Sequence, residues 1–212
     1  DDRTTDSIEL NVLAEAPPTV PAAFADSKFV FLANTMPKLQ HELLAQIRRP
    51  VFVAADTMRC WIQDHLGDLK SLFKKIDCLI INEDEAKQLA EEQNLIKAGQ
   101  IILDMGLSVV VIKKGESGSL MCAADGEKFL LPAYPATEVI DPTGAGDSFA
   151  GGFMGCLAQA GKTDFATLKE AIAYGTVTAS FTIADFSLNC LSATSRAEID
   201  RRLQNLRKVT SF

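Results

Sequence analysis

The run Asp141–Met154 holds the residues best suited to chemistry in this sequence. Gly144 and Gly146 flank a single alanine, and Asp147 follows where an apolar helix is expected. Glycine allows a sharp turn and lets a ligand approach the main chain. The first amides of a helix lack internal partners and carry the positive end of its dipole, so they form a seat for an anion. A carboxylate beside such a seat suits a base that takes a proton from a hydroxyl attacking phosphate.

This run resembles the C-terminal signature of the PfkB, or ribokinase-like, family of carbohydrate and nucleoside kinases. That signature places Gly-Ala-Gly-Asp shortly after an acidic or polar residue and continues into a helix of small residues. The resemblance implies that Asp147 is the catalytic base. It also implies that the amides of Gly144, Ala145 and Gly146 stabilise the charge on the phosphoryl group in transfer. The alternative is an ordinary strand–turn–helix junction in which Asp147 complements the helix dipole.

A second candidate site lies at Asn82-Glu-Asp-Glu85, between an apolar strand and a helix. Asn82 stands at a helix N-cap and Glu85 follows at the spacing of a capping box. The family has an Asn-x-x-Glu motif at this place, and the resemblance implies that Asn82 and Glu85 organise Mg²⁺ near the phosphates of ATP. Magnesium keeps several waters and takes few carboxylates, so one glutamate is compatible with this role. Capping does not exclude metal binding.

The segment Lys113–Gly118 leaves a strand and enters a hairpin. From the residues alone it is a flexible, solvated turn. In the family a turn with two glycines at this spacing lies along the nucleotide, so the resemblance implies that Gly115 and Gly118 contact ATP. Lys113 falls where the family places a threonine or lysine near phosphate. A cation there would offset the charge of a triphosphate.

Asp141 and Thr143 open the signature turn, and Pro142 fixes the backbone angle φ between them. The residues predict an Asx turn, in which the aspartate side chain accepts a hydrogen bond from a nearby amide. In several family members the equivalent residues also help to hold a monovalent cation such as K⁺. The resemblance therefore adds Asp141 and Thr143 to the cofactor-binding set.

Apolar runs alternate with helical patterns through the first half of the chain. Buried parallel strands are expected at 29–32, 51–55, 78–81 and 108–112, and helices at 38–47, 66–76, 83–92 and 95–105. This alternation favours right-handed βαβ units. We expect an α/β protein with a ribokinase-like, doubly wound, mostly parallel sheet and helices on both faces.

The pattern changes after residue 112. Runs at 119–123 and 127–131 flank Asp125-Gly126, which predicts a hairpin. Only helices are expected beyond the signature, at 149–160, 165–184 and 195–207. In the first of these, Gly151 and Gly155 lie one turn apart, and we expect them to allow close packing against a neighbouring helix.

Composition excludes several classes of function. With 47% hydrophobic and 23% charged residues, the chain of 212 residues is typical of a soluble globular protein. A net charge of −7 and scattered Lys and Arg exclude a nucleic-acid partner. No apolar run is long enough to span a membrane. The five cysteines form no CxxC pair, which favours reduced thiols and a cytoplasmic protein.

The start of the chain resembles a piece of a larger fold. Polar and apolar residues alternate over Asp6–Val12, which predicts a half-buried strand. We interpret residues 1–16 as the remnant of the family's lid strand region and 17–212 as the ribokinase-like core that binds ATP and carries catalysis. The exposed edge of that strand would permit a homodimer. The family's sugar-binding residues precede the matched region, so the chain resembles a member lacking its N-terminal third.

The resulting hypothesis is an ATP-dependent phosphotransferase that moves the γ-phosphate to a hydroxyl of a sugar or related small molecule. One alternative is a nucleoside kinase of the same family. A second is a nucleotide-binding fragment or regulatory protein without turnover. An assay over a panel of sugars and nucleosides with ATP separates the three.

Overall fold

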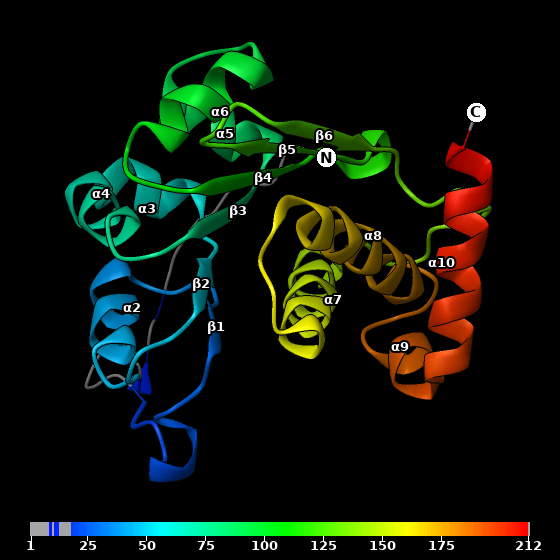
Figure 1. Ribbon diagram of the computed structural model, residues 1–212, viewed down its shortest axis with the longest axis horizontal. Coiled ribbons are helices and arrows are strands. Elements are labelled where there is room, and N and C mark those ends of the chain that lie inside the picture. The colour runs from blue at the N-terminus through cyan, green and yellow to red at the C-terminus, as the bar shows by residue number, and fades with distance from the viewer. Residues whose placement is uncertain (1–8, 10, 13–17, 212) are drawn as a thin grey trace.

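A six-stranded sheet forms the centre of the computed structural model, which describes residues 9, 11–12 and 18–211. The strands lie in chain order: β1 (Phe29–Leu32), β2 (Phe52–Ala55), β3 (Cys78–Asn82), β4 (Val109–Lys113), β5 (Ser119–Ala123) and β6 (Lys128–Leu131). The first four pair in parallel, whereas β5 and β6 pair antiparallel as the hairpin predicted around Asp125-Gly126. The predicted mostly parallel α/β sheet is therefore confirmed (Figure 1).

The central strands are apolar throughout because both of their faces are covered. In β2, Val53 and Ala55 belong to one buried cluster, and Phe52 and Ala54 belong to the other. Strands β3 and β4 alternate in the same way. Since successive side chains of a strand point to opposite faces, these continuous apolar runs supply two cores at once.

The connecting helices cover one face of the sheet. They are α2 (Pro37–Leu44), α3 (Arg59–Asp64), α4 (Leu66–Phe73), α5 (Glu83–Ala90) and α6 (Leu95–Leu103). Each crossover between neighbouring parallel strands is expected to be right-handed, and β1 to β4 follow one another in one direction, so their helices share a face. The short helix α3 was not predicted from the sequence. It forms where Trp61 and Ile62 are buried.

The C-terminal helices cover the opposite face. They are α7 (Ala145–Ala160), α8 (Phe165–Thr182), α9 (Asn189–Ala193) and α10 (Arg196–Thr210). Figure 1 shows α7 and α8 side by side, with α10 crossing at their outer side. The helices predicted at 165–184 and 195–207 are present with shifted ends. Helix α9 was not predicted, and α7 begins before the predicted residue 149.

The contact between α7 and α8 depends on glycines, but not on the pair singled out from the sequence. A Cβ on Gly152 would overlap the hydroxyl of Thr178, and one on Gly175 would come within 2.7 Å of the carbonyl oxygen of Phe149. A Cβ on Gly151 or Gly155 would meet no atom within 4 Å. The expectation for Gly151 and Gly155 was therefore wrong, because they lie on the exposed side of α7.

The predicted lid strand lies mainly outside the described residues. Of Asp6–Val12, only residues 9, 11 and 12 are described, and none of them is in a strand. Asn11 has a φ of 50°, a left-handed backbone that does not continue a strand. The division into a lid remnant and a core, and dimerisation through the lid strand, stay predictions.

Within the described chain, no helix is both long enough and apolar enough to cross a bilayer.

The two sides of α7 are expected to respond oppositely to the same change. Gly152→Ala should lower the free energy of unfolding by about 1–3 kcal/mol, because a methyl group overpacks the contact with α8. Gly151→Ala should raise it by about 0.5–1 kcal/mol, because alanine favours an exposed helix position. Urea unfolding measures both values. Equal changes in the two variants would contradict this account of the helix contact.

Candidate active site

Polar side chains gather at the carboxyl ends of three neighbouring strands. Asp56 follows β2, Asn82 ends β3 and Lys113 ends β4. These strands are parallel, and Asn82 is paired in register with Lys113. The carboxyl edge of such a sheet is where α/β proteins bind their ligands. The topology therefore brings Asp56, Asn82 and Lys113 to one edge of the sheet.

The Gly-Ala-Gly-Asp run is the first turn of α7 rather than a loop before it. Gly144 is the N-cap, with a left-handed backbone at φ 78°, and the helix begins at Ala145. Because Gly144 has no side chain, no capping side chain satisfies the amides that follow it. Asp147 lies in the first turn and is exposed. Its side chain makes no hydrogen bond or ion pair with the described part of the chain.

The turn that precedes α7 is held at both ends. The Oδ1 atom of Asp141 accepts from the amide of Thr143 at 2.9 Å, which is the predicted Asx turn. The amide of Ile140 donates to the carbonyl of Ile183, which directly follows α8, at 2.8 Å. A Cβ added to Gly144 would come within 3.8 Å of Thr182 near the same helix end. The start of α7 is thus positioned by the end of α8.

Lys113 joins the sheet to the first turn of α7. A Cβ on Gly146 would lie 2.9 Å from the Nζ atom of Lys113, so the ammonium group rests directly against this glycine. A side chain at position 146 would displace it. The helix dipole and the ammonium group are both positive here, and together they make a seat for an anion. Asp147, the next residue, places a carboxylate beside that seat.

Asn82 and Glu85 form the predicted capping box. The amide of Asn82 donates to Glu85 Oε2 at 2.9 Å, and the amide of Glu85 donates to Asn82 Oδ1 at 2.8 Å. Glu85 is buried, and burial raises the pKa of its carboxyl against the opposing effects of the Asn82 amide, Lys113 and Arg59. Arg59 itself lies 3.8 Å from Asp84 in an exposed ion pair.

Asp56 belongs to this site and was missed as a site residue in the sequence. It is 8% exposed, and its Oδ1 atom has no hydrogen-bond partner in the described part of the chain. Burial raises the pKa of Asp56 to about 7, the Lys113 ammonium opposes this, and Asp147 and Glu85 add to it. The one signal available was its position directly after a buried strand. Four ionisable groups from β2, α5, β4 and α7 thus influence one another.

The glycines of the hairpin entry have different roles. Gly118 has a φ of 84°, and a Cβ there would overlap the carbonyl oxygen of Leu131 at the end of β6. Its carbonyl accepts from the amide of Lys114 at 2.7 Å, which closes the turn. Gly115, at φ 55°, faces open space. The contact with Leu131 therefore requires glycine at position 118, whereas Gly115 faces space that a ligand could occupy.

Oxygen donors suit a hard cation here, although they do not form a complete cage. Among residues 9, 11–12 and 18–211, no three His, Cys, Asp or Glu side chains come together as a metal-binding group. The unpartnered Oδ1 of buried Asp56 and the carboxylate of Glu85 are of the chemical type that Mg²⁺ binds, with waters completing the shell. The residues present therefore fit a metal ion held largely through water.

The chain belongs to the pfkB family of carbohydrate kinases, whose family model matches residues 6–193. A cytidine kinase from Thermococcus kodakarensis is 29% identical over 161 residues, which cover 74% of this chain and 55% of that protein. A fructoselysine 6-kinase from Escherichia coli is 41% identical over 93 residues, covering 44% of this chain and 33% of that protein. The chain spans about half the length of the cytidine kinase.

Solved structures support the same fold. A fructokinase from Vibrio cholerae, in a form with fructose, ADP and calcium ion bound, matches with a TM-score of 0.73 at 19% identity. The match covers 90% of this chain and 64% of that one. A ribokinase from Thermotoga maritima matches with a TM-score of 0.66 at 26% identity, covering 93% and 60%. The ribokinase-like architecture inferred from the sequence is confirmed.

Asp56 is expected to make stability fall with rising pH. Its pKa rises from 3.8 to about 7 on folding, so the native state binds a proton that the unfolded state has released. The stabilisation is present below the unfolded pKa and is lost as pH rises through the folded pKa. Asp56→Asn removes this dependence. Its free energy of unfolding relative to the parent should rise by about 1 kcal/mol or more between about pH 5 and about pH 8.

Urea unfolding at the two pH values measures the difference. Asp64→Asn, at an exposed residue that ends α3, serves as the control and should show no such change. A difference between Asp56→Asn and parent that does not depend on pH would contradict the buried, protonated carboxyl.

Proposed function

We propose that this chain is the phosphate-handling part of an ATP-dependent kinase that phosphorylates a hydroxyl of a sugar or nucleoside. The observation that carries the proposal is the first turn of α7. There an exposed carboxylate, Asp147, lies next to an anion seat made by helix amides and the ammonium of Lys113. Family membership supports the same reaction class. An anion seat without a base would suit phosphate binding alone, whereas a base beside it suits transfer.

In this mechanism Asp147 accepts the proton of the acceptor hydroxyl as its oxygen attacks the γ-phosphorus of ATP. The bond from that phosphorus to the bridging oxygen breaks, and ADP leaves with the electron pair. The amides at Gly144–Gly146 and the ammonium of Lys113 stabilise the charge on the transferred group. The hydrogen bond from the amide of Ile140 to the carbonyl of Ile183, at the end of α8, keeps this seat preorganised.

The cofactors we propose are ATP and Mg²⁺, with a monovalent cation such as K⁺ as an addition. Asn82 and Glu85 would hold the magnesium through water, with Asp56 beside them. Mg²⁺ would neutralise phosphate charge and orient the transferred group. Lys113, Gly115 and Gly118 would line the nucleotide. For K⁺, the supporting observation is the Asx turn of Asp141 and Thr143.

The acceptor is proposed only as a class. The related proteins named above act on a nucleoside in one case and on sugar derivatives in others, by their names. A nucleoside acceptor is therefore the second candidate, and the panel assay of the full-length protein decides between them. We also propose a cytoplasmic location, which the five unpaired cysteine thiols support.

Asp147→Asn tests the base. It should lower kcat by a factor of about 10² to 10⁴ while the KM for ATP changes little, because the charge is lost but the anion seat remains. Steady-state kinetics of the full-length protein measure both constants. Asp104→Asn, remote in sequence and placed at the end of α6, is the control. Unchanged kcat in Asp147→Asn would overturn the mechanism, and ATP binding without turnover on any acceptor would favour the regulatory alternative.

Glu85→Gln tests the metal role. It should raise the Mg²⁺ concentration needed for half-maximal rate by about tenfold, because a neutral amide holds the hydrated ion less well. Its stability should fall by about 1 kcal/mol through the weakened capping box. Glu83→Gln is the matched control, since Glu83 lies in the same helical turn and pairs with Lys87 at 2.6 Å. Loss of stability without a change in the Mg²⁺ requirement would leave Glu85 a capping residue only.

A further inference from the structure

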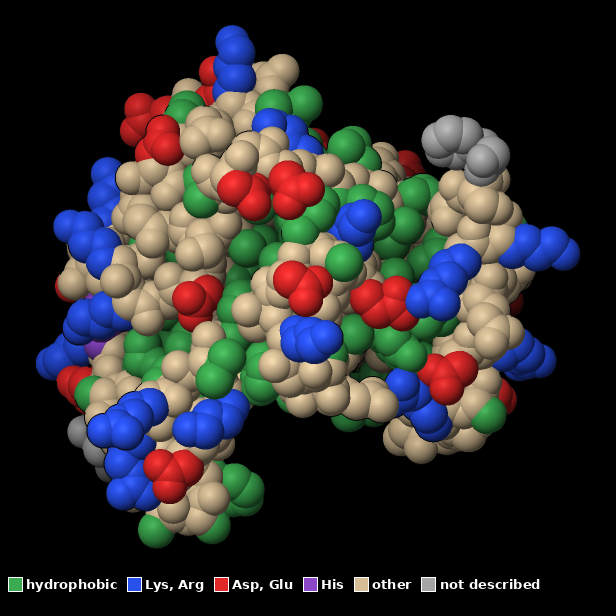
Figure 2. All heavy atoms as spheres, in the orientation of Figure 1, with side chains coloured by type: hydrophobic (Ala, Val, Ile, Leu, Met, Phe, Trp, Pro, Cys, Tyr) green, Lys and Arg blue, Asp and Glu red, His purple; other side chains and the backbone are tan. Residues whose placement is uncertain are grey.

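Helix α10 is strongly basic in an acidic protein. It carries five Arg or Lys side chains and two acidic ones, although the whole chain has a net charge of −7. Figure 2 shows Lys and Arg side chains gathered over α10 at the right of the molecule. The contacts of each charged side chain determine how much of this positive charge is neutralised.

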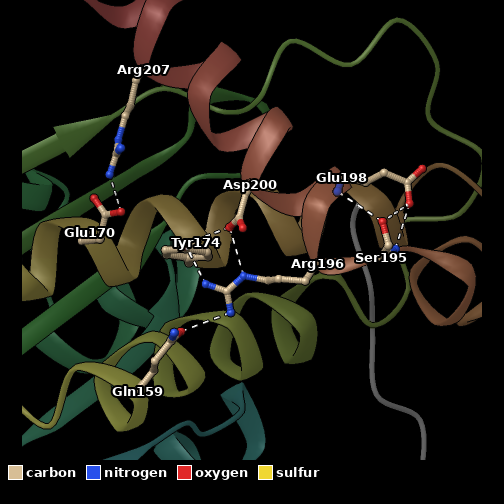
Figure 3. Close-up of polar contacts among 8 residues, drawn as sticks. All are labelled: Gln159, Glu170, Tyr174, Ser195, Arg196, Glu198, Asp200 and Arg207. Carbon is tan, nitrogen blue, oxygen red and sulfur yellow. Dashed lines mark hydrogen bonds and ion pairs between the residues drawn. The ribbon is translucent and has the colours of Figure 1, made fainter.

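The two acidic residues of α10 have partners of their own, and they do not neutralise all of the Arg and Lys side chains on this helix. Asp200 pairs with Arg196 at 3.0 Å, and Glu198 forms the capping box with Ser195. Arg207 forms its ion pair with Glu170 of α8 (Figure 3). In the described part of the chain, Arg201 and Arg202 pair with no carboxylate.

Arg202 is half-buried despite lacking an anionic partner. The carbon of its guanidinium lies 3.5 Å from the ring centre of Phe181 and 4.9 Å from that of Tyr134. Its Nη1 atom donates to the hydroxyl of Ser180 at 2.9 Å. Burial lowers the pKa of this guanidinium. Aromatic contacts and one neutral hydrogen bond offset only part of the cost of removing a cation from water.

A cavity opens beside this side chain. Its volume is about 370 Å³, and Tyr134, Arg201, Arg202 and Asn205 line it. The amide nitrogen of Asn205 donates to the hydroxyl of Tyr134 at 3.0 Å, which fixes both groups at the wall. The hollow is open to solvent, so a small anion can reach the side chains that line it. None of the residues placed in the candidate active site lines this cavity.

We propose that this cavity binds a small organic phosphate. Arg201 and Arg202 supply two guanidinium groups, whose planar forks match phosphate oxygens and whose charges match a dianion. The aromatic rings hold the Arg202 guanidinium in place before binding, so little freedom is lost when an anion arrives. Tyr134 and Asn205 add polar contacts at the wall. Arg202 connects the cavity to α8, since it contacts Ser180 and Phe181 near the end of that helix.

The experiment uses inorganic phosphate as the probe at constant ionic strength. The Asn205 side-chain amide and the Arg202 Nε–H are followed by ¹⁵N nuclear magnetic resonance. Both signals should shift saturably in the parent protein. Arg201→Gln, an exposed change that leaves the fold intact, should weaken the apparent affinity about fivefold. Arg202→Gln should weaken it more.

Two controls separate this cavity from other anion sites. Lys208→Gln removes a charge from the same helix outside the cavity and should leave the affinity unchanged. Lys113→Met disrupts the anion seat at α7 and should leave the Asn205 response intact. The proposal fails if no saturable shift appears, if Lys208→Gln weakens binding as much as Arg201→Gln, or if the Asn205 response disappears in Lys113→Met. It also fails if acetate gives the same response as phosphate.

Discussion

The ammonium of Lys113 rests against Gly146, and this contact links the end of β4 to the first turn of α7. Lys113 belongs to the central sheet, whereas Gly146 belongs to the layer of C-terminal helices that covers one face of that sheet. A side chain larger than hydrogen at 146 would displace the ammonium group from the first turn of α7. The glycine at 146 therefore lets the ammonium group reach the first turn of α7, and the α7–α8 contact through Gly152 and Gly175 holds that helix in place.

One cation at this point faces several carboxylates. Glu85 and Asp147 both raise the pKa of Asp56, whereas Lys113 lowers the pKa of Asp56 and, together with Arg59, that of Glu85. Burial favours a neutral Asp56 under these conditions. A divalent cation entering the site would reverse that preference by favouring the charged carboxylates. The carboxylates thus favour the entry of a divalent cation, and a polyphosphate bound with that cation would balance its charge.

Much of the fold could be predicted because the apolar runs are long enough to be strands and alternate with helical patterns. The capping box at Asn82 was equally readable, since its two residues lie close in sequence. The start of α7 was placed too late because glycines disfavour helix interiors and the left-handed cap at Gly144 is invisible in a sequence. The wrong expectation for Gly151 and Gly155 has another origin. Which side of an apolar helix meets its neighbour depends on packing that no local pattern records.

Glu85 has a structural role in the capping box and a proposed role in metal binding, and this affects how relatives of the chain should be interpreted. Its carboxylate closes a capping box, so a relative without the proposed phosphoryl transfer would still lose stability if this residue were replaced. Selection for a stable fold would then keep Asn82 and Glu85 even in a relative without the proposed activity. Asp147 is exposed and bonded to nothing in the described chain, so no such folding penalty protects it. If Asp147 is the proposed base, the residue at position 147 therefore distinguishes active relatives from inactive ones better than the residues at 82 and 85 do.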